Sequence, residues 1–216
     1  MGKLKISAKG LSKRFNREWI FHDFTFDFNQ EGIYAITGPN GSGKSTLLQV
    51  LWGQMPASKG NVSYFLDNQI LPDEEIYQHL SVATPYMDLI EEFTLEEQLQ
   101  FHFKIKPIKS GFTLPQVIES MYLQDASKKP IGNFSSGMKQ RLKLGLAFFT
   151  ETPIIFLDEP GTNLDHKAFE WYLEILEKMG KGRLILIASN QPKEYPQNTE
   201  VINISMYKYN SNVKSL

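Results

Sequence analysis

One short segment constrains the fold of this chain most strongly, because it needs a strand before it and a helix after it. An apolar run at 33–36 leads into a glycine-rich stretch of the pattern G-x-x-x-x-G-K-[ST], and a second apolar run follows at 47–52. The stretch consists of Gly38, Pro39, Asn40, Gly41, Ser42, Gly43, Lys44, Ser45 and Thr46. A strand, a glycine turn and a helix N-terminus in this order form a phosphate-binding loop.

The residue types of this loop each predict a separate role. Gly41 and Gly43 allow positive φ and a close approach of the backbone to an anion. Lys44 is expected to reach the β- and γ-phosphates of a nucleotide, and the Ser45 hydroxyl is expected to bind Mg²⁺. The alternative is an ordinary glycine turn without a binding role, and the flanking strand and helix argue against this alternative.

Composition limits the other classes of function. The chain has 216 residues, enough for one large α/β domain or a core with a smaller lobe. Its 23 Lys and Arg against 24 Asp and Glu give a net charge of -1, so no overall attraction to nucleic acid is expected. The absence of Cys excludes thiol chemistry and disulfides. No apolar run approaches the ~18 residues of a membrane helix.

The apolar pattern divides the chain into regions. Alternation at Phe24, Phe26 and Phe28 predicts a half-buried strand, and 61–66 predicts another. Leu95, Leu99 and Phe103 define one helix face in a separate helical lobe, where breaks are expected at Pro107, Gly111 and Pro115. Helices at 142–149 and 168–179 then alternate with short apolar strands at 154–157 and 184–188. This alternation predicts an α/β fold with a mostly parallel sheet covered on both faces.

Two acids end the strand at 154–157. A carboxylate at the end of a strand beside a phosphate loop commonly holds Mg²⁺, so Asp158 is assigned to the metal shell. Glu159 is then placed to orient or deprotonate an attacking water. The alternative is a solvated acid pair at a strand end.

The segment Phe134 to Arg141 reads FSSGMKQR, and it resembles the signature of ATP-binding cassette (ABC) ATPases. The pieces GPNGSGKSTLL, SSGMKQRLKLGLA, IIFLDEP and TNLD also follow the order of an ABC nucleotide-binding domain, and the resemblance covers nearly the whole chain. It implies a P-loop NTPase core with an N-terminal antiparallel β subdomain and an inserted α-helical subdomain. The implied single domain spans 1–216, with the core at 1–85 and 150–216 and the helical subdomain at 86–149.

The resemblance also implies that two cassettes pack head to tail on ATP. Ser135 and the backbone of Gly137 would then contact the γ-phosphate held by the other subunit, although Ser135 alone reads as a helix cap. Asp165 would link the two sites, or simply cap the next helix. Phe15 stands where the family stacks an aromatic ring on adenine, with core packing as the alternative role and Trp19 as a competing candidate.

The chain departs from the family at several positions. Tyr86 stands where the family has a Gln at the junction between core and helical lobe, and Asn190 stands in place of the usual His. Ser136 and Met138 also differ from the usual signature. Asn can donate a hydrogen bond to a phosphate but cannot become a cation. We therefore expect Glu159, assisted by Asn190, to support slow hydrolysis.

The function implied by the resemblance is an ATP-binding and ATP-hydrolysing subunit of an ABC transporter, with ATP and Mg²⁺ as cofactors. Its implied partners are a separate polytopic membrane permease and a second cassette, in a homodimer or a heterodimer, with no nucleic acid. The implied location is cytoplasmic and peripheral on the cytoplasmic face of the membrane. Alternatives are a soluble ABC-type ATPase that acts on ribosomes or nucleic acid, and a slowly hydrolysing nucleotide-gated binding module.

Overall fold

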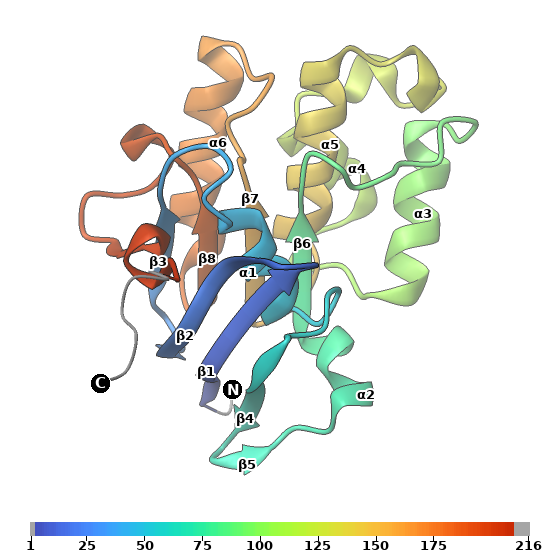
Figure 1. Cartoon of the computed structure of the whole chain (residues 1–216). Helices are drawn as coiled ribbons and strands as arrows, with labels where there is room; N and C mark the ends of the chain where they lie inside the picture. The colour runs from blue at the N-terminus through green and yellow to red at the C-terminus, as the bar shows by residue number, and fades with distance from the viewer. Residues whose placement is uncertain (1–2, 210–216) are drawn as a thin grey trace, which may run out of the picture.

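The computed structural model describes residues 3–209, which form two β-sheets and the helices packed around them (Figure 1). The first sheet is antiparallel and has the order β2-β1-β4-β5. Its strands are β1 (Leu4–Phe15), β2 (Glu18–Asn29), β4 (Lys59–Leu66) and β5 (Gln69–Ile70). Phe24 and Phe28 on β2 are fully buried and Phe26 is half-buried, whereas Thr25 and Asp27 are exposed, which confirms the period of two.

The second sheet is parallel and has the order β6-β7-β8-β3-β9. Its strands are β3 (Ile33–Thr37), β6 (Leu80–Ala83), β7 (Ile154–Asp158), β8 (Leu184–Ala188) and β9 (Glu200–Asn203). Every residue of β7 and β8 is buried, as the two short apolar runs predict. The strands β6 and β9 at the edges are additional to those that the sequence predicts.

The continuous apolar runs are explained by two cores that share this sheet. Ile155 and Leu157 of β7 contribute to a core on one face, together with α5 and α6. Ile154 and Phe156 contribute to a second core on the other face, which includes α1 and the antiparallel sheet. Because successive side chains of a strand point to opposite faces, each apolar residue of β7 lies in one core or the other.

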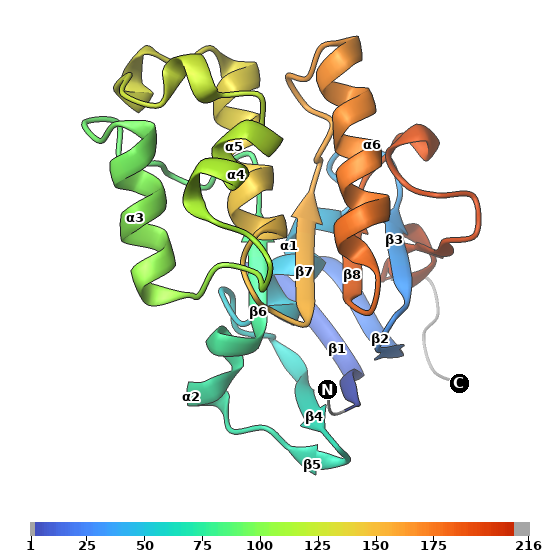
Figure 2. The same ribbon diagram turned by 180° about the vertical axis from the view of Figure 1, so that it is seen from behind.

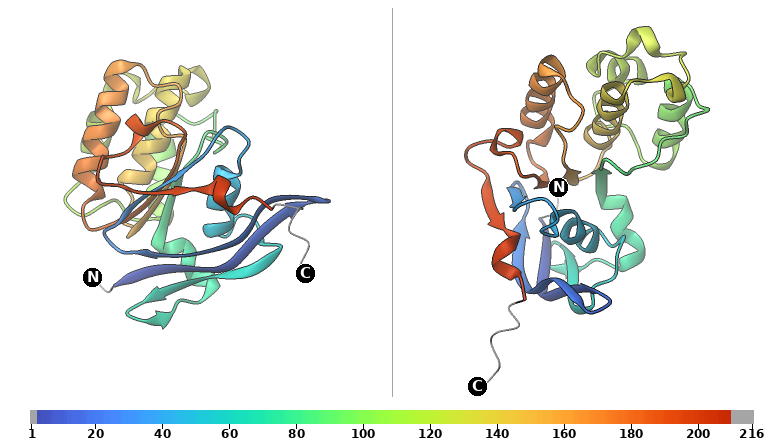
Figure 3. Two further views of the ribbon diagram at one scale, coloured as in Figure 1. Left: turned by 60° about the vertical axis from the view of Figure 1, so that its left-hand side comes forward. Right: turned by 45° about the horizontal axis from the view of Figure 1, so that its top comes forward.

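The helices separate into three groups. Helix α1 (Lys44–Leu51) lies between the two sheets (Figure 3, left). Helices α5 (Ser136–Phe148) and α6 (His166–Gly180) cover the opposite face of the parallel sheet (Figure 2). The lobe beside α5 contains α3 (Leu95–Ile105) and α4 (Leu114–Ser120), and α2 (Asp73–Ile76) precedes β6. Within residues 3–209 no helix is both long and apolar enough to cross a membrane.

The helical lobe differs from the expectation at one proline. Pro115 does not break the chain but lies in the first turn of α4, where its missing N–H costs no intrahelical bond. Thr113 and Gln116 form a capping box there, with the Thr113 N–H donating to Gln116 Oε1 at 2.8 Å. Thr94 and Glu97 form the same arrangement at the start of α3. Side-chain caps therefore define where both lobe helices begin.

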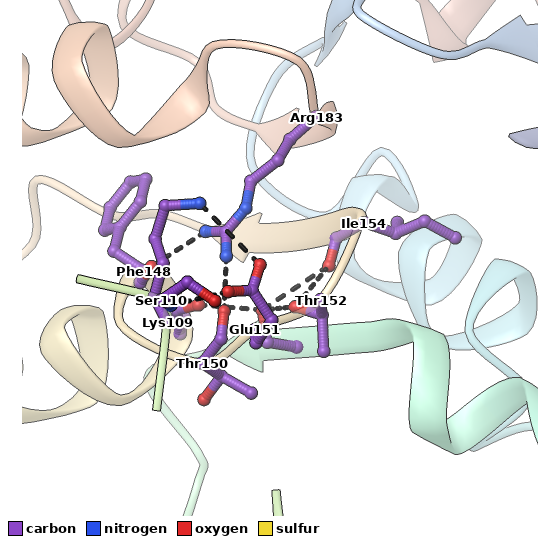
Figure 4. A network of polar contacts seen from close by, with 10 residues as sticks. Lys109, Ser110, Phe148, Thr150, Glu151, Thr152, Ile154 and Arg183 are labelled. Carbon is purple, nitrogen blue, oxygen red and sulfur yellow. Dashed lines mark hydrogen bonds and ion pairs between the residues drawn. The ribbon is translucent and has the colours of Figure 1, made fainter. Parts of the chain in front are cut away.

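A buried arginine joins the end of α5 to the start of the parallel sheet (Figure 4). The Arg183 guanidinium donates to the carbonyl oxygens of Phe148, at 2.7 Å, and of Thr150. Beside it, Glu151 accepts from the Ser110 N–H at 2.6 Å and lies 3.9 Å from the Lys109 ammonium. Only 3% of Arg183 is exposed. Its N–H groups bond to carbonyl oxygens at the C-terminal end of α5, where carbonyls lack a partner within the helix. This network lies at the amino ends of the strands.

Candidate functional site

The site is built at the carboxyl edge of the parallel sheet, where four loops meet. The strand β3 leads into the phosphate loop, β6 into the segment with Tyr86, β7 into Asp158 and Glu159, and β8 into Asn190. Because these strands are parallel, their carboxyl ends lie along one edge. The topology therefore brings the phosphate loop, the acid pair and Asn190 together from positions far apart in the sequence.

The phosphate loop has the backbone expected of it. The φ angles of Gly41 and Gly43 are 74° and 104°, in the left-handed region that favours glycine. The Lys44 side chain is buried, and its ammonium donates to the carbonyls of Gly38 at 3.0 Å and Pro39 at 3.2 Å. The loop thus wraps around a cation at the N-terminus of α1.

One polar atom in the loop marks a place for an anion. The Ser42 hydroxyl is buried and has no hydrogen-bond partner among the described residues. A buried hydroxyl without a partner costs free energy unless a ligand or water satisfies it. It lies in the same loop as the Lys44 ammonium, so the chemistry of this concavity suits a phosphate.

The Ser45 hydroxyl and the Asp158 carboxylate meet across the end of β8. Ser45 Oγ donates to Asp158 Oδ1 at 2.9 Å, although 113 residues separate them. Asp158 is 1% exposed, and burial raises its pKa to about 6, a shift that the Ser45 bond opposes and Glu159 assists. A hydroxyl and a carboxylate are the hard oxygen ligands that Mg²⁺ prefers. Such a pair fits an ion that would complete its shell with phosphate and water. The described residues contain no cluster of three or more His, Cys, Asp or Glu that could hold a metal ion.

Glu159 directly follows Asp158 in the sequence and has a strained backbone conformation. Its φ is 45°, which is uncommon for a residue with a side chain, and its N–H donates to the Ala188 carbonyl at 2.9 Å. The following Pro160 carbonyl accepts from Gln140 Nε2 of α5 at 2.9 Å. Bonds from β8 and α5 therefore hold the half-buried Glu159 at the sheet edge.

Asn190 is linked to the phosphate loop by its side chain. Its Nδ2 donates to Asn40 Oδ1 at 2.8 Å, over a separation of 150 residues. Each of the two side-chain amides carries a donor and an acceptor, so the pair can form with either residue as the donor. The structure thus brings Asn190 against the same loop that contains Lys44 and Ser45.

The signature residues lie apart from this group. Ser135 caps α5, with its Oγ accepting from the Met138 N–H at 3.2 Å, and Asp165 caps α6, with its Oδ1 accepting from the Ala168 N–H at 2.8 Å. Gly137 approaches the loop before α6, because a methyl group there would lie 3.0 Å from the Asn163 carbonyl oxygen. No hydrogen bond among residues 3–209 connects Ser135 or Gly137 to the phosphate loop. Within a single chain, Ser135 and Asp165 therefore act as helix caps.

Two aromatic candidates differ in their surroundings. Phe15 is 46% exposed, and the Lys13 ammonium lies 5.1 Å from its ring centroid. Trp19 instead lines a hollow of about 460 Å³ that opens beside Gly41. The remaining lining residues of this hollow are Arg17, Glu18, Ile20, Lys208 and Tyr209. The Trp19 and Tyr209 rings are 6.0 Å apart and inclined by 37°.

The sequence analysis missed several residues that support the site. Lys143 of α5 is 9% exposed and donates to the Pro85 carbonyl at 2.5 Å, next to Tyr86, which is itself 82% exposed. Gln140 supports the turn after Glu159 from the same helix. Both side chains are buried in the assembled fold, and no local pattern of the sequence marks them.

The chain is similar to proteins of one family. A family model described as ABC transporter matches residues 21–162. The uncharacterized ABC transporter ATP-binding protein YcbN of Bacillus subtilis (strain 168) is 25% identical over 201 residues, which are 92% of this chain and 66% of YcbN. The cytochrome c biogenesis ATP-binding export protein CcmA of Chelativorans sp. (strain BNC1) is 26% identical over 194 residues, or 88% of this chain and 93% of CcmA.

A solved structure agrees with the sequence comparisons. An ATP-binding subunit of an ABC transporter superposes with a TM-score of 0.79 at 27% identity, over 93% of this chain and 86% of that one. The family match includes the phosphate loop, the signature segment and the acid pair, and it spans well over half of the chain. The chain therefore belongs to the ABC transporter family, as one of its ATP-binding subunits.

Proposed function

We propose that this chain binds ATP with Mg²⁺ and hydrolyses it slowly to drive a separate membrane subunit. The observation that carries the proposal is the meeting of Lys44, the Ser45–Asp158 pair, Glu159 and Asn190 at one sheet edge. The family generally hydrolyses ATP. The rate and the individual roles below belong to the proposal.

The phosphate loop is proposed to hold the β- and γ-phosphates. The backbone N–H groups at the start of α1 and the Lys44 ammonium supply positive charge, and the Gly38, Pro39, Gly41, Gly43 and Thr46 backbone shapes the loop. Ser45 and Asp158 would hold Mg²⁺, which would supply positive charge to neutralise the phosphates.

Glu159 is proposed to accept the proton of the attacking water. Bonds to Ala188 and from Gln140 fix its turn, so the backbone that carries the carboxylate is supported from two elements. Asn190 would exchange its bond to Asn40 for a bond to the γ-phosphate. An amide adds no charge there, which supports slow turnover.

The hollow beside Gly41 supports a location for the nucleoside. Trp19 and Tyr209 offer aromatic faces there, so Trp19 is the stronger candidate for stacking on the base, and Phe15 remains the alternative given by its place in the sequence.

Two partners are proposed, and each would contact a different surface of the chain. A second cassette, identical or different, would place its Ser135 and Gly137 on the γ-phosphate of the first, with Asp165 between the sites. A polytopic permease would dock where the core meets the helical lobe, near Tyr86 and the half-buried Phe93. In this proposal the chain lies at the cytoplasmic face of a membrane, and 86–149 form the helical subdomain beside a core of 1–85 and 150–216.

Two measurements test the proposal. MgATP titration and phosphate release are compared for the wild type, Lys44→Ala and Glu159→Gln. We expect Lys44→Ala to lose most of the MgATP affinity, and Glu159→Gln to bind ATP but release little phosphate. Wild-type turnover no faster than that of Glu159→Gln would refute hydrolysis. Co-purification of tagged chain with a polytopic membrane protein would support the transport role, and recovery with ribosomes or nucleic acid would contradict it.

A further inference from the structure

Glu194 is a buried acid with no part in the function proposed above. It ends the short helix Pro192–Glu194 after β8, and only 2% of it is exposed. Burial raises the pKa of Glu194, and the nearby Glu159 carboxylate adds to this rise, while hydrogen bonds from Ser189 and the Gly161 backbone oppose it. A carboxyl group in such a position needs partners that compensate for lost hydration.

The first partner is the turn that follows Glu159. Gly161 lies against Glu194 so closely that a methyl group at 161 would overlap Glu194 Oε1 and lie 2.8 Å from the Phe169 ring. The turn is closed by the Thr162 N–H, which donates to the Glu159 carbonyl at 3.1 Å. The Glu194 carboxyl group therefore packs on the backbone of the turn that sets the direction of Glu159.

The second partner is Ser189, which immediately precedes Asn190. Ser189 is 1% exposed, and its N–H donates to the Ile36 carbonyl at 3.1 Å, so it continues the pairing of β8 with β3. Its hydroxyl accepts from the Gln191 N–H at 2.9 Å and lies 3.3 Å from the Gln191 carbonyl oxygen, and the same hydroxyl lowers the pKa of Glu194. The Ser189 hydroxyl thus ties together the two residues that flank Asn190, Ser189 and Gln191.

The main chain of Glu194 is itself fixed by α6. The Tyr172 hydroxyl, fully buried, donates to the Glu194 carbonyl at 2.7 Å. The neighbouring Lys193 ammonium lies 4.9 Å from the Phe169 ring centroid. The backbone that carries the carboxyl group is therefore held by α6. It lies between the loop that contains Glu159 and the loop that contains Asn190.

We infer that Glu194 is a positioning residue that fixes the spacing between Glu159 and Asn190 through Gly161 and Ser189. The inference rests on the proposed function, because spacing matters only if both side chains act on the same phosphate. A small displacement of a catalytic group commonly costs up to ~100-fold in rate, while ground-state binding through Lys44 and the backbone of the phosphate loop is expected to change little.

The test separates turnover from binding in Glu194→Ala and Glu194→Gln. We expect kcat to fall about tenfold in Glu194→Ala with the Kd for MgATP within about twofold of wild type. Glu194→Gln retains one acceptor oxygen, so its kcat is expected to lie between those of Glu194→Ala and the wild type. Glu151→Gln is the matched control, because Glu151 also accepts a backbone N–H but lies at the opposite end of the strands. It should leave kcat unchanged.

A double variant makes the contact itself measurable. Gly161→Ala should lower kcat by displacing the Glu194 carboxyl group. Gly161→Ala with Glu194→Ala should lose less than the sum of the two single losses, since the overlap with Glu194 is gone and only the close approach to the Phe169 ring remains. Unchanged kcat in Glu194→Ala, or strictly additive losses, would overturn the positioning role. Wild-type turnover at the level of Glu159→Gln would instead remove the proposed hydrolysis, and the reason for positioning with it.

Discussion

At the scale of single residues, Asn190 is proposed to limit how fast the site works. Its amide already reaches the phosphate loop through Asn40 at 2.8 Å, so in this proposal its chemistry and not its position limits the rate. A donor placed for a transition state commonly contributes a factor of ~100 or more, of which an amide supplies part. We expect Asn190→His to raise kcat about tenfold in a phosphate-release assay.

Asn190→Ala provides the control for this prediction. It removes the donor without offering an imidazole, so its kcat should fall below that of the wild type. An Asn190→His variant with equal or lower turnover, at unchanged MgATP affinity, would show that Asn190 does not limit the rate.

The two aromatic candidates can be separated because only one lines the hollow beside Gly41. Stacking of a base on an aromatic ring contributes roughly 1–3 kcal/mol, so Trp19→Ala should weaken ATP binding about tenfold. Inorganic tripolyphosphate has no base, and its affinity should not change. Isothermal titration with both ligands measures this. If Phe15→Ala weakens ATP selectively and Trp19→Ala does not, the family position is the correct one.

At the scale of elements, the sequence predicts those that have a strong local signal. The phosphate loop, β7, β8 and the helix faces follow from glycine spacing and apolar periodicity, and the structure confirms them. The sequence predicts a break at Pro115, which the structure shows to be wrong. A proline is common both at a break and in the first turn of a helix, and only the Thr113 cap distinguishes the two cases.

Other features depend on contacts that no local pattern contains. The edge strands β6 and β9 are four residues each, and their pairing with β7 and β3 makes them strands. The Ser45–Asp158 and Asn190–Asn40 bonds join residues 113 and 150 positions apart. Glu194 and Lys143 read as ordinary surface charges, because burial is decided by the assembled fold.

The attachment of α3 to the rest of the molecule gives a prediction about pH. His102 Nε2 lies 2.8 Å from Thr150 Oγ1, and that hydroxyl donates to the Leu146 carbonyl, so the imidazole is the donor to Thr150. Burial, assisted by the charge of Lys106, lowers the pKa of His102 to about 4. The unfolded chain, with a His pKa of ~6.5, therefore takes up this proton first as the pH falls.

The His102 contribution to the free energy of unfolding should fall by about 2 kcal/mol between pH 7 and pH 5, and should stay constant above pH ~7. Urea unfolding of the wild type and His102→Gln at both pH values measures it, since Gln can still donate to Thr150 but does not titrate. The wild type should lose about 2 kcal/mol more than the variant. Equal losses in the two proteins would mean that His102 is protonated in the folded state.

At the scale of the whole molecule, the proposed site is incomplete within one chain. The phosphate loop and the acid pair meet at the sheet edge, whereas Ser135 and Gly137 have no hydrogen bond to that loop within residues 3–209. We propose that a second cassette supplies the phosphate contact from the signature. The N-terminus of α5, with its backbone N–H groups and positive dipole end, is suited to supply it.

Ser135→Asp tests whether Ser135 does more than cap its helix. Asp caps as well as Ser, so folding stability should stay within about 0.5 kcal/mol, but a carboxylate facing the γ-phosphate is repelled. In a Glu159→Gln background, which is expected to retain ATP, light scattering should show dimers with MgATP that Ser135→Asp abolishes. Ser135→Ala is the complementary case, since it loses about 1 kcal/mol of stability with the cap but adds no charge, so it should still dimerise weakly. Full ATP-dependent dimerisation of the Ser135→Asp variant would restrict Ser135 to its capping role and leave the closed site without its signature contact.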